Sequence, residues 1–247
     1  MAILRKLRRF EKTVILSVLL GACVAPSPPI ADGTVNSSKQ VGESETAPES
    51  KRLNAPGPTP EPSEPIVNIA DDFRMGKRDA AIGVLEFSDF QCPYCRDFHN
   101  SLLPQLQETY INTGIVQYIY KDFPLRMHRE AVPAALAAGC AGAQEQYWLM
   151  HDRLFANQEH LGNSLYVKLA RDLNLDVERF EACMRDRAQV LRVNRDVMQG
   201  RQLGVSATPT IMLGRVDGDY FTVLRIAKGV PNIETFVREI EKLRGDR

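Results

Sequence analysis

Two cysteines that follow an apolar run constrain this chain more than any other feature of its sequence. Residues 82–90 read IGVLEFSDF, and the length and apolar character of this run predict a buried β-strand. Cys92 and Cys95 come directly after it, and Pro93 lies between them. Proline is tolerated at the first position of a helix, where its missing N–H has no intrahelical partner. The sequence therefore predicts a strand, a tight turn at Cys92 and a helix that begins at Pro93.

This arrangement places the Cys92 sulfur at the amino-terminal end of the predicted helix. Unpaired N–H groups and the positive end of the helix dipole lie there, and both favour a thiolate over a thiol. Each unit by which the pKa falls below the free value of ~8.5 corresponds to about 1.4 kcal/mol. A stabilised thiolate makes the corresponding disulfide a stronger oxidant. Because Cys95 lies one turn further on and can resolve a mixed disulfide formed at Cys92, the sequence predicts a redox-active pair.

Two other interpretations of the pair are less favoured but remain open. A purely structural disulfide would close a very small loop and remove little entropy from the unfolded chain. A zinc site needs about four ligands, and His99 is the only local candidate for a third. A Cu(I) site made by the two thiols alone is harder to exclude. We expect no metal at this site.

Glu86 interrupts the apolar strand six residues before Cys92. A carboxyl group in such a place is expected to be partly desolvated, with its pKa raised toward neutrality. A group of this kind can accept or return the Cys95 proton during thiol–disulfide exchange. The alternative is a glutamate at the end of the strand that faces solvent.

The rest of the folded part alternates between strands and helices. Residues 114–123 predict a second strand, and a long helical stretch follows from about residue 128 to about residue 203. The segments TPTIMLG and YFTVLRIA predict two more strands, and Asn232 is the expected N-cap of a last helix.

Three residues near the second predicted strand have no assigned role in this interpretation. Lys121 and Asp122 close the strand, either near the active face or as solvated charges at its end. His128 follows a few residues later, and the sequence offers no partner for it.

Four stretches of this chain resemble successive landmarks of one known family. VLEFSDFQCPYC, YKDFPLRMH, AAGCAGAQEQYWLMHDRLF and LGVSATPTIML are similar to segments of the DsbA-like thiol–disulfide oxidoreductases. The resemblance runs from about residue 79 to the last predicted helix. It implies an α/β protein with a thioredoxin-like fold over residues 66–247 and an inserted α-helical domain at about residues 128–203.

The resemblance also implies roles for Thr208 and Pro209. It makes Pro209 a cis proline beside the two cysteines, and an X–Pro bond is the one kind of peptide bond for which the cis form costs little. The exposed backbone of Thr208 would then pair with an extended substrate segment by strand addition. A trans proline that opens a strand is the alternative.

The implied activity needs no cofactor. Its substrates would be cysteine-containing exported proteins, and a redox partner, either in the membrane or soluble, would recycle the pair. Oxidation is the favoured direction, because isomerases of this superfamily usually carry a dimerisation domain, which the proline-rich tether cannot supply. We expect a monomer. A reductase, an isomerase or a copper chaperone with the same fold remain alternatives.

Cys140 and Cys183 lie in the predicted helical stretch, 43 residues apart. Related family members carry cysteines at both places, and export into an oxidising compartment would favour a bond between them. We therefore predict a structural disulfide, against the alternative of two buried free thiols.

The amino-terminal part of the chain has the character of a lipoprotein export signal followed by a tether. Residues 1–22 carry five basic residues and a ten-residue apolar run, too short to span a membrane. The following LGAC resembles a lipobox, which makes Cys23 the acylated residue; an ordinary signal with a chance cysteine is the alternative. Nine of the fifteen prolines lie in residues 24–65, so residues 23–65 are expected to form a disordered tether.

These segments place the folded part outside the cytoplasm, in the periplasm or an equivalent extracytoplasmic space, on a lipid anchor. The whole chain has 31 basic and 31 acidic residues, and residues 1–22 carry five basic and one acidic. Removing them leaves a net charge of about −4, which suggests no nucleic-acid partner.

Replacing Cys23 by Ser should release the protein from the membrane fraction, because the acylation site is lost. Fractionation of cells followed by immunoblotting measures this, and the unchanged chain is the control. A variant that stays membrane-bound and uncleaved would contradict the lipobox assignment.

Overall fold

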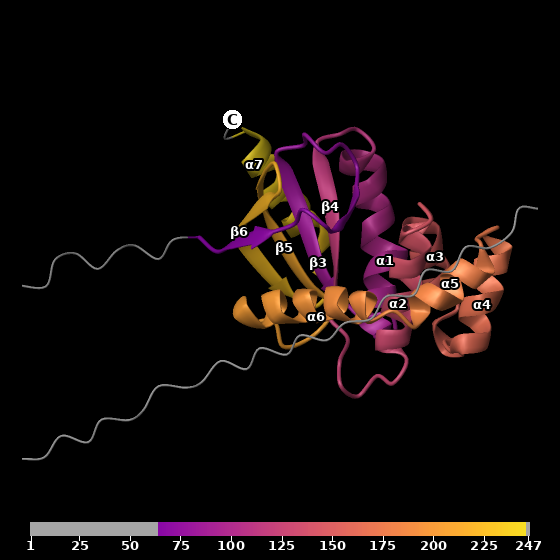
Figure 1. Cartoon of the computed structure of the whole chain (residues 1–247). Coiled ribbons are helices and arrows are strands. Elements are labelled where there is room, and N and C mark those ends of the chain that lie inside the picture. Colours follow the sequence, from indigo (N-terminus) through magenta and orange to yellow (C-terminus); the bar gives the residue numbers. More distant parts are fainter. Residues whose placement is uncertain (1–63, 246–247) are drawn as a thin grey trace, which may run out of the picture. The chain divides into compact units, whose positions relative to one another are not determined.

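A six-stranded mixed β-sheet runs through residues 64–245, the part of the chain that the computed structural model describes (Figure 1). Its strand order is β1-β6-β5-β3-β4-β2. The central strand β3 (Ile82–Ser88) pairs in parallel with β4 (Val116–Asp122) and antiparallel with β5 (Thr210–Asp217). Next to β5 lies β6 (Tyr220–Lys228). The predicted signal segment, Cys23 and nearly all of the predicted tether lie outside the described residues.

Two edge strands of three residues each were absent from the predicted order. They are β1 (Ile66–Asn68), which pairs with β6, and β2 (Phe73–Met75), which pairs with β4. Segments this short carry too few residues for a periodic pattern to identify them.

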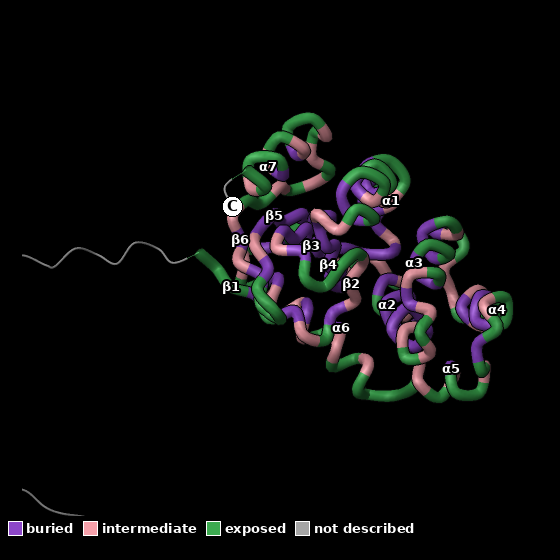
Figure 2. The backbone as a smooth tube through the Cα atoms, turned by 90° about the horizontal axis from the view of Figure 1, so that it is seen from above, coloured by how far each residue is buried: buried purple, intermediate pink, exposed green. Residues whose placement is uncertain are grey.

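The two faces of the sheet are covered by different helices (Figure 2). Ile82 and Val84 of β3 point toward α1 (Pro93–Leu106) and α7 (Ile233–Gly245), where Phe98 and Phe236 pack against them in one core. Side chains at the alternate positions of β3, such as Phe87, belong to a second core beneath α6 (Arg187–Gln202). Cover on both faces explains why β3 reads as an almost continuous apolar run.

The stretch predicted as helical between β4 and β5 consists of five separate helices. After an irregular loop the chain forms α2 (Ala131–Gly142), α3 (Tyr147–Ala156), α4 (Asn163–Asp172), α5 (Val177–Met184) and α6, with a 3₁₀ turn, η2 (Gln158–His160), between α3 and α4. A π-helical turn, η1 (Gln107–Ile111), ends α1. Asn232 caps α7, since its side-chain oxygen accepts the Thr235 N–H at 3.0 Å.

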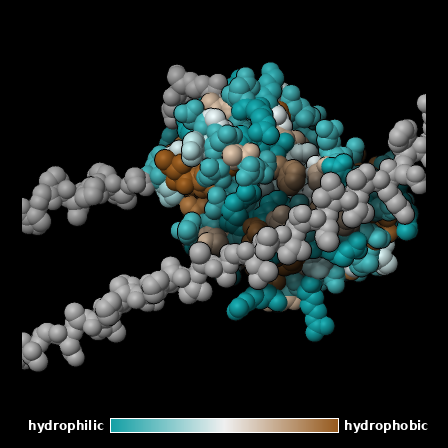
Figure 3. Space-filling view, viewed as in Figure 1, coloured by the Kyte–Doolittle hydropathy of each residue, from teal (hydrophilic) through white to brown (hydrophobic). Residues whose placement is uncertain are grey.

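The surface seen in Figure 3 is mostly hydrophilic, with hydrophobic side chains gathered near the β1–β6 edge, where Ile66 is exposed. Within residues 64–245, none of the helices combines the length and the apolar character that crossing a bilayer requires.

A disulfide joins Cys140 on α2 to Cys183 on α5, with an S–S distance of 2.07 Å. α2 is rich in small residues, and its alanines from Ala134 to Ala141 are buried. Small side chains allow neighbouring helices to approach α2 closely. The disulfide joins α2 to α5, two helices that also pack against each other.

Replacing Cys140 and Cys183 together by Ala should lower the free energy of unfolding by about 4 kcal/mol, because the bond closes a loop of about 43 residues. Urea unfolding followed by far-UV circular dichroism measures the difference. Alkylation of the denatured, unreduced protein should leave both cysteines unlabelled. Recovery of two alkylated thiols, or equal stability of the variant, would contradict the prediction.

Candidate active site

Cys92 occupies the N-cap position of α1, and Pro93 is the first helical residue. Its extended backbone (φ −78°, ψ 122°) turns the chain from β3 into the helix. The Cys92 carbonyl accepts hydrogen bonds from the backbone N–H groups of Cys95, at 3.1 Å, and Arg96, at 3.2 Å. Both thiols are free, and Cys95 is completely buried whereas Cys92 keeps a small exposed surface. The local geometry is the one that the strand–turn–helix pattern predicts.

A distant loop lies directly against the Cys92 sulfur. The peptide bond between Thr208 and Pro209 is cis, and the Cys92 sulfur lies 3.4 Å from the Thr208 carbonyl oxygen, to which it donates in its protonated form. The antiparallel pairing of β3 with β5 brings these segments together, since Phe87 pairs with Thr210 only two residues after Thr208.

The surroundings of the two sulfurs move their pKa values in opposite directions. A hydrogen bond from the Cys95 thiol, aided by the N–H groups of Cys95 and Tyr94 and by the nearby Thr208 side chain, lowers the pKa of Cys92 to about 5. Burial raises the pKa of Cys95 well above its ordinary value, and the nearby charges of Glu86 and Cys92 raise it further. Cys92 is therefore a thiolate at neutral pH, and Cys95 keeps its proton.

Glu86 is buried on the face of β3 that carries α1, so the alternative of a solvent-facing glutamate is wrong. The Tyr118 hydroxyl donates to its Oε2, whereas Oε1 is buried without a hydrogen-bond partner among the described residues. Burial raises the pKa of Glu86 to about 7. Such a carboxyl can gain and lose a proton near neutral pH, close enough to Cys95 to influence the thiol electrostatically.

Asp89 organises the turn before Cys92, and the sequence analysis missed it. Its Oδ1 accepts the Gln91 N–H at 2.7 Å. Its Oδ2 accepts the Leu125 N–H at 2.8 Å and lies 2.7 Å from Nδ1 of His128. This buried carboxylate ties the loop after β4 to the cysteine turn, and it supplies the partner that the sequence did not reveal for His128.

Gln158, in the 3₁₀ turn of the helical insertion, holds the same turn from another side. Its Nε2 donates to the Phe90 carbonyl at 2.8 Å and to the Cys92 carbonyl at 2.9 Å. Arg96 of α1 also pairs with Glu159 of this turn, at 2.7 Å. A side chain of the insertion thus binds the backbone carbonyl of the reactive cysteine.

Lys121 and Asp122 are buried, so their interpretation as solvated strand-end charges is wrong. The Lys121 ammonium lies 2.5 Å from an Asp72 carboxylate oxygen, and Asp122 pairs with Arg192 at 2.7 Å. These pairs link the end of β4 to α6 and to the segment between β1 and β2.

His99, the one local candidate for a third metal ligand beside the cysteines, faces α3 instead. Its Nε2 lies 3.9 Å from Oδ1 of Asp152, and its ring lies 5.0 Å from that of His151. These three residues are the one group among the described residues that could hold a metal, and it includes neither thiol.

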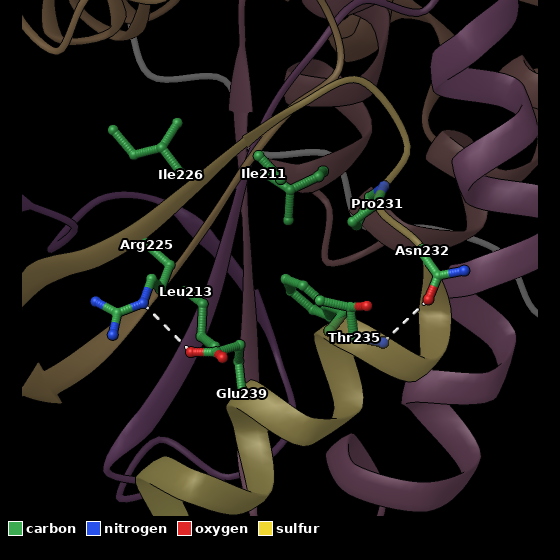
Figure 4. Close-up of a pocket in the computed structure, with 10 residues that line it drawn as sticks. Ile211, Leu213, Arg225, Ile226, Pro231, Asn232, Thr235 and Glu239 are labelled. Atoms are coloured by element: carbon green, nitrogen blue, oxygen red, sulfur yellow. Dashed lines mark hydrogen bonds and ion pairs between the residues drawn. The ribbon is translucent and has the colours of Figure 1, made fainter.

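A cavity of about 360 Å³ lies between β5, β6 and α7 (Figure 4). Ile211 and Leu213 line it from β5, and an ion pair of 3.3 Å between Arg225 and Glu239 borders it. It contains neither thiol, so the chemistry belongs to the Cys92 turn and not to this cavity.

Comparison with known proteins agrees with this geometry. A family model described as Thioredoxin matches residues 69–222. DsbA1 of Wolbachia pipientis is 25% identical with a TM-score of 0.63, over 71% of this chain and 92% of that protein. Oxidised BdbD of Bacillus subtilis is 23% identical with a TM-score of 0.62, over 73% and 96%. The predicted thioredoxin-like fold with a helical insertion is confirmed.

Two curated relatives differ in how much of their length this chain matches. The probable disulfide bond formation protein D of Bacillus cereus is 29% identical over 146 residues, which are 56% of this chain and 67% of that protein. The Na(+)/H(+) antiporter NhaA 3 of Salinispora tropica is 35% identical over 143 residues, 58% of this chain. The match spans only 21% of the antiporter, so it concerns a part of that protein.

Because the pKa of Cys92 is low, we expect the pH midpoint of its alkylation rate to be low as well. In the reduced protein, the rate of Cys92 modification should rise around pH 5, while Cys95 should stay unreactive at neutral pH. Thr208→Val should move the midpoint upward, because the Thr208 side chain contributes to the lowered pKa of Cys92. Brief alkylation across a pH series, mapped by mass spectrometry, measures both rates.

Thr222→Val, the same change on β6 where Thr222 pairs with Arg215 near the far end of β5, is the matched control and should leave the midpoint in place. If Cys95 is the faster thiol at acidic pH, the assignment of Cys92 as the thiolate is wrong.

Proposed function

This chain belongs to the thioredoxin family, and we propose that it is a thiol–disulfide oxidoreductase that exchanges disulfides with proteins through Cys92 and Cys95. The observation that carries the proposal is the asymmetry of the pair. Cys92 is 3% exposed and favours the thiolate, whereas Cys95 has no exposed surface and keeps its proton. A structural disulfide would need no such difference between its two sulfurs.

In the oxidising direction the reaction starts from the Cys92–Cys95 disulfide. A substrate thiolate attacks the Cys92 sulfur, the Cys92–Cys95 bond breaks, and Cys95 leaves with the electron pair and takes up a proton. Glu86, with a pKa of about 7, is the group we assign to supply that proton. A second substrate thiolate then attacks the substrate sulfur of the mixed disulfide. The substrate gains a disulfide and Cys92 departs as a thiolate, so both cysteines end reduced.

We propose oxidation as the net direction because the stabilised thiolate favours the reduced enzyme, and a stable reduced form makes the disulfide a strong oxidant. The relative in Bacillus cereus bears the name of a disulfide bond formation protein, which supports the same direction. Thr208 and Pro209 are the proposed contact for the substrate backbone.

The proposed setting follows the sequence interpretation. The protein acts as a monomer outside the cytoplasm, held to a membrane by lipid on Cys23, and its substrates are exported proteins with cysteines. A redox partner reoxidises the pair after each turnover.

The purified protein should form disulfides in a reduced, unfolded test substrate with two cysteines, and Cys92→Ser should abolish this activity. When Cys95→Ser is mixed with the disulfide form of the substrate, Cys92 attacks one substrate sulfur and the other substrate sulfur leaves as a thiolate. The resulting mixed disulfide should accumulate, because Cys95 is missing and cannot attack Cys92 to release the substrate. Glu86→Gln should slow the opening of the Cys92–Cys95 disulfide by about 10²-fold or more, as expected for loss of a general acid. Gel mobility and mass spectrometry after acid quenching follow each species.

Two results would overturn the proposal. One is a reduction potential of the pair near or below about −270 mV, which is typical of a reductant such as thioredoxin and would reverse the direction. The other is tight binding of one Cu(I) by the two thiols without any exchange activity, which would identify a copper-binding protein.

A further inference from the structure

A hollow of about 580 Å³ lies beside the loop that contains Thr208 and Pro209. One wall is the loop after β4, residues 123–127, which projects from the end of the sheet (Figure 1). The other wall is the segment 205–207, and Val197 and Arg201 of α6 complete the lining. We call this hollow the Met127 groove.

The groove contains apolar side chains that the rest of residues 64–245 leaves wholly or partly exposed. Met127 is 78% exposed, and Leu125 and Val197 are half-buried. Contiguous apolar surface of this kind marks interaction sites, and methionine adapts its shape to varied partners. The groove therefore fits an apolar side chain from another polypeptide.

The charges at the groove have one sign. Arg126 and Arg201 are exposed in its lining, which contains no acidic residue. Neither guanidinium forms an ion pair within residues 64–245. Arginine binds carboxylates through paired N–H donors, so an acidic side chain complements this rim.

Both walls of the groove are connected to residues near the reacting Cys92 sulfur. The segment 205–207 leads directly into Thr208, whose carbonyl lies 3.4 Å from the Cys92 sulfur. On the opposite wall, Asp89 of the cysteine turn holds the Leu125 N–H. A polypeptide whose cysteine reacts at Cys92 thus has the groove next to its flanking residues.

We propose that the Met127 groove binds the residues that flank a substrate cysteine, and that it selects substrates with an apolar and an acidic side chain within a few residues of that cysteine. The inference rests on the proposed function and adds to it the substrate class. The apolar side chain packs against Met127 and Leu125, and the carboxylate pairs with Arg126 or Arg201.

The test measures the first exchange step alone. The full chain carries Cys23→Ser and Cys95→Ser, so that Cys92 is its one free thiol. Each peptide carries a central cysteine activated as a mixed disulfide with thionitrobenzoate. The Cys92 thiolate attacks the peptide sulfur, a Cys92–peptide disulfide forms, and thionitrobenzoate leaves with the electron pair as a coloured anion.

One peptide places leucine and aspartate symmetrically on both sides of the cysteine, and its partner has glycine and lysine at the same positions. Every rate is divided by the rate with 2,2′-dithiodipyridine, a small uncharged disulfide that reports Cys92 by itself. The acidic peptide should react about tenfold faster than the basic one, as one apolar contact and one charge pair would give.

Reversing both charges with Arg126→Glu and Arg201→Glu should abolish or invert this preference, and Met127→Ala should lower the normalised rate of the leucine peptide severalfold. Arg171→Glu, the same change at an exposed residue of α4 outside the groove, is the matched control and should keep the preference.

A normalised ratio near one, or a preference that survives both charge reversals, overturns the inference. So does a concentration-dependent dimer that Met127→Glu abolishes, since it would assign the groove to a second copy of the chain. No reaction of Cys92 even with the small disulfide would instead contradict the proposed function, so the two failures are distinguishable.

Discussion

The antiparallel pairing of β3 with β5 is the interaction on which the rest of this site depends. It joins two segments that lie more than a hundred residues apart, and it sets the Thr208 carbonyl against the Cys92 sulfur. Each segment supplies a different part of the site: the helix start favours a thiolate at Cys92, and the segment before β5 brings the Thr208 carbonyl to within 3.4 Å of that sulfur. The inserted helices can therefore lie between β4 and β5 in the chain without disturbing the pair.

Hydrogen bonds between buried polar side chains and the backbone hold the turn around Cys92 in place. Asp89 holds the loop after β4, and Gln158 holds the Phe90 and Cys92 carbonyls from the insertion. A buried donor or acceptor that loses its partner costs about 1–3 kcal/mol, so these contacts strongly favour one arrangement of the loops. The same loops form a wall of the Met127 groove, so the groove's shape depends on the cysteine turn. In the proposed function, this coupling places the substrate-binding groove and the reactive Cys92 in one small region.

Local patterns predicted the central features of the fold, whereas contacts between distant segments escaped prediction. The apolar run of β3, the cysteine at the start of α1 and the N-cap Asn232 depend on neighbouring residues, and the structure has all three. Asp89 and Gln158 act on groups 36 to 68 residues away, and a single sequence carries no sign of such pairs. The interpretation of Lys121 and Asp122 as solvated charges was wrong for the same reason. Their partners, Asp72, Arg192 and Asp196, come from distant parts of the chain. The resemblance to a known family supplied Thr208 and Pro209, which spacing alone would not have joined to the cysteines.

Cys92 and Glu86 give the reduced site opposed responses to pH. The pKa of Cys92 falls from about 9 to about 5, so its thiolate stabilises the fold fully above pH 9 and this contribution is lost as pH falls through 5. The pKa of Glu86 rises from 4.5 to about 7, so its neutral form favours the fold below pH 4.5 and this contribution is lost as pH rises through 7. Between about pH 5 and 7 the two effects oppose each other, and above pH 7 only that of Cys92 still grows. Since the disulfide form has no thiolate, this gain belongs to the reduced protein alone. The stabilised thiolate favours the reduced pair and therefore supports the proposed oxidising direction.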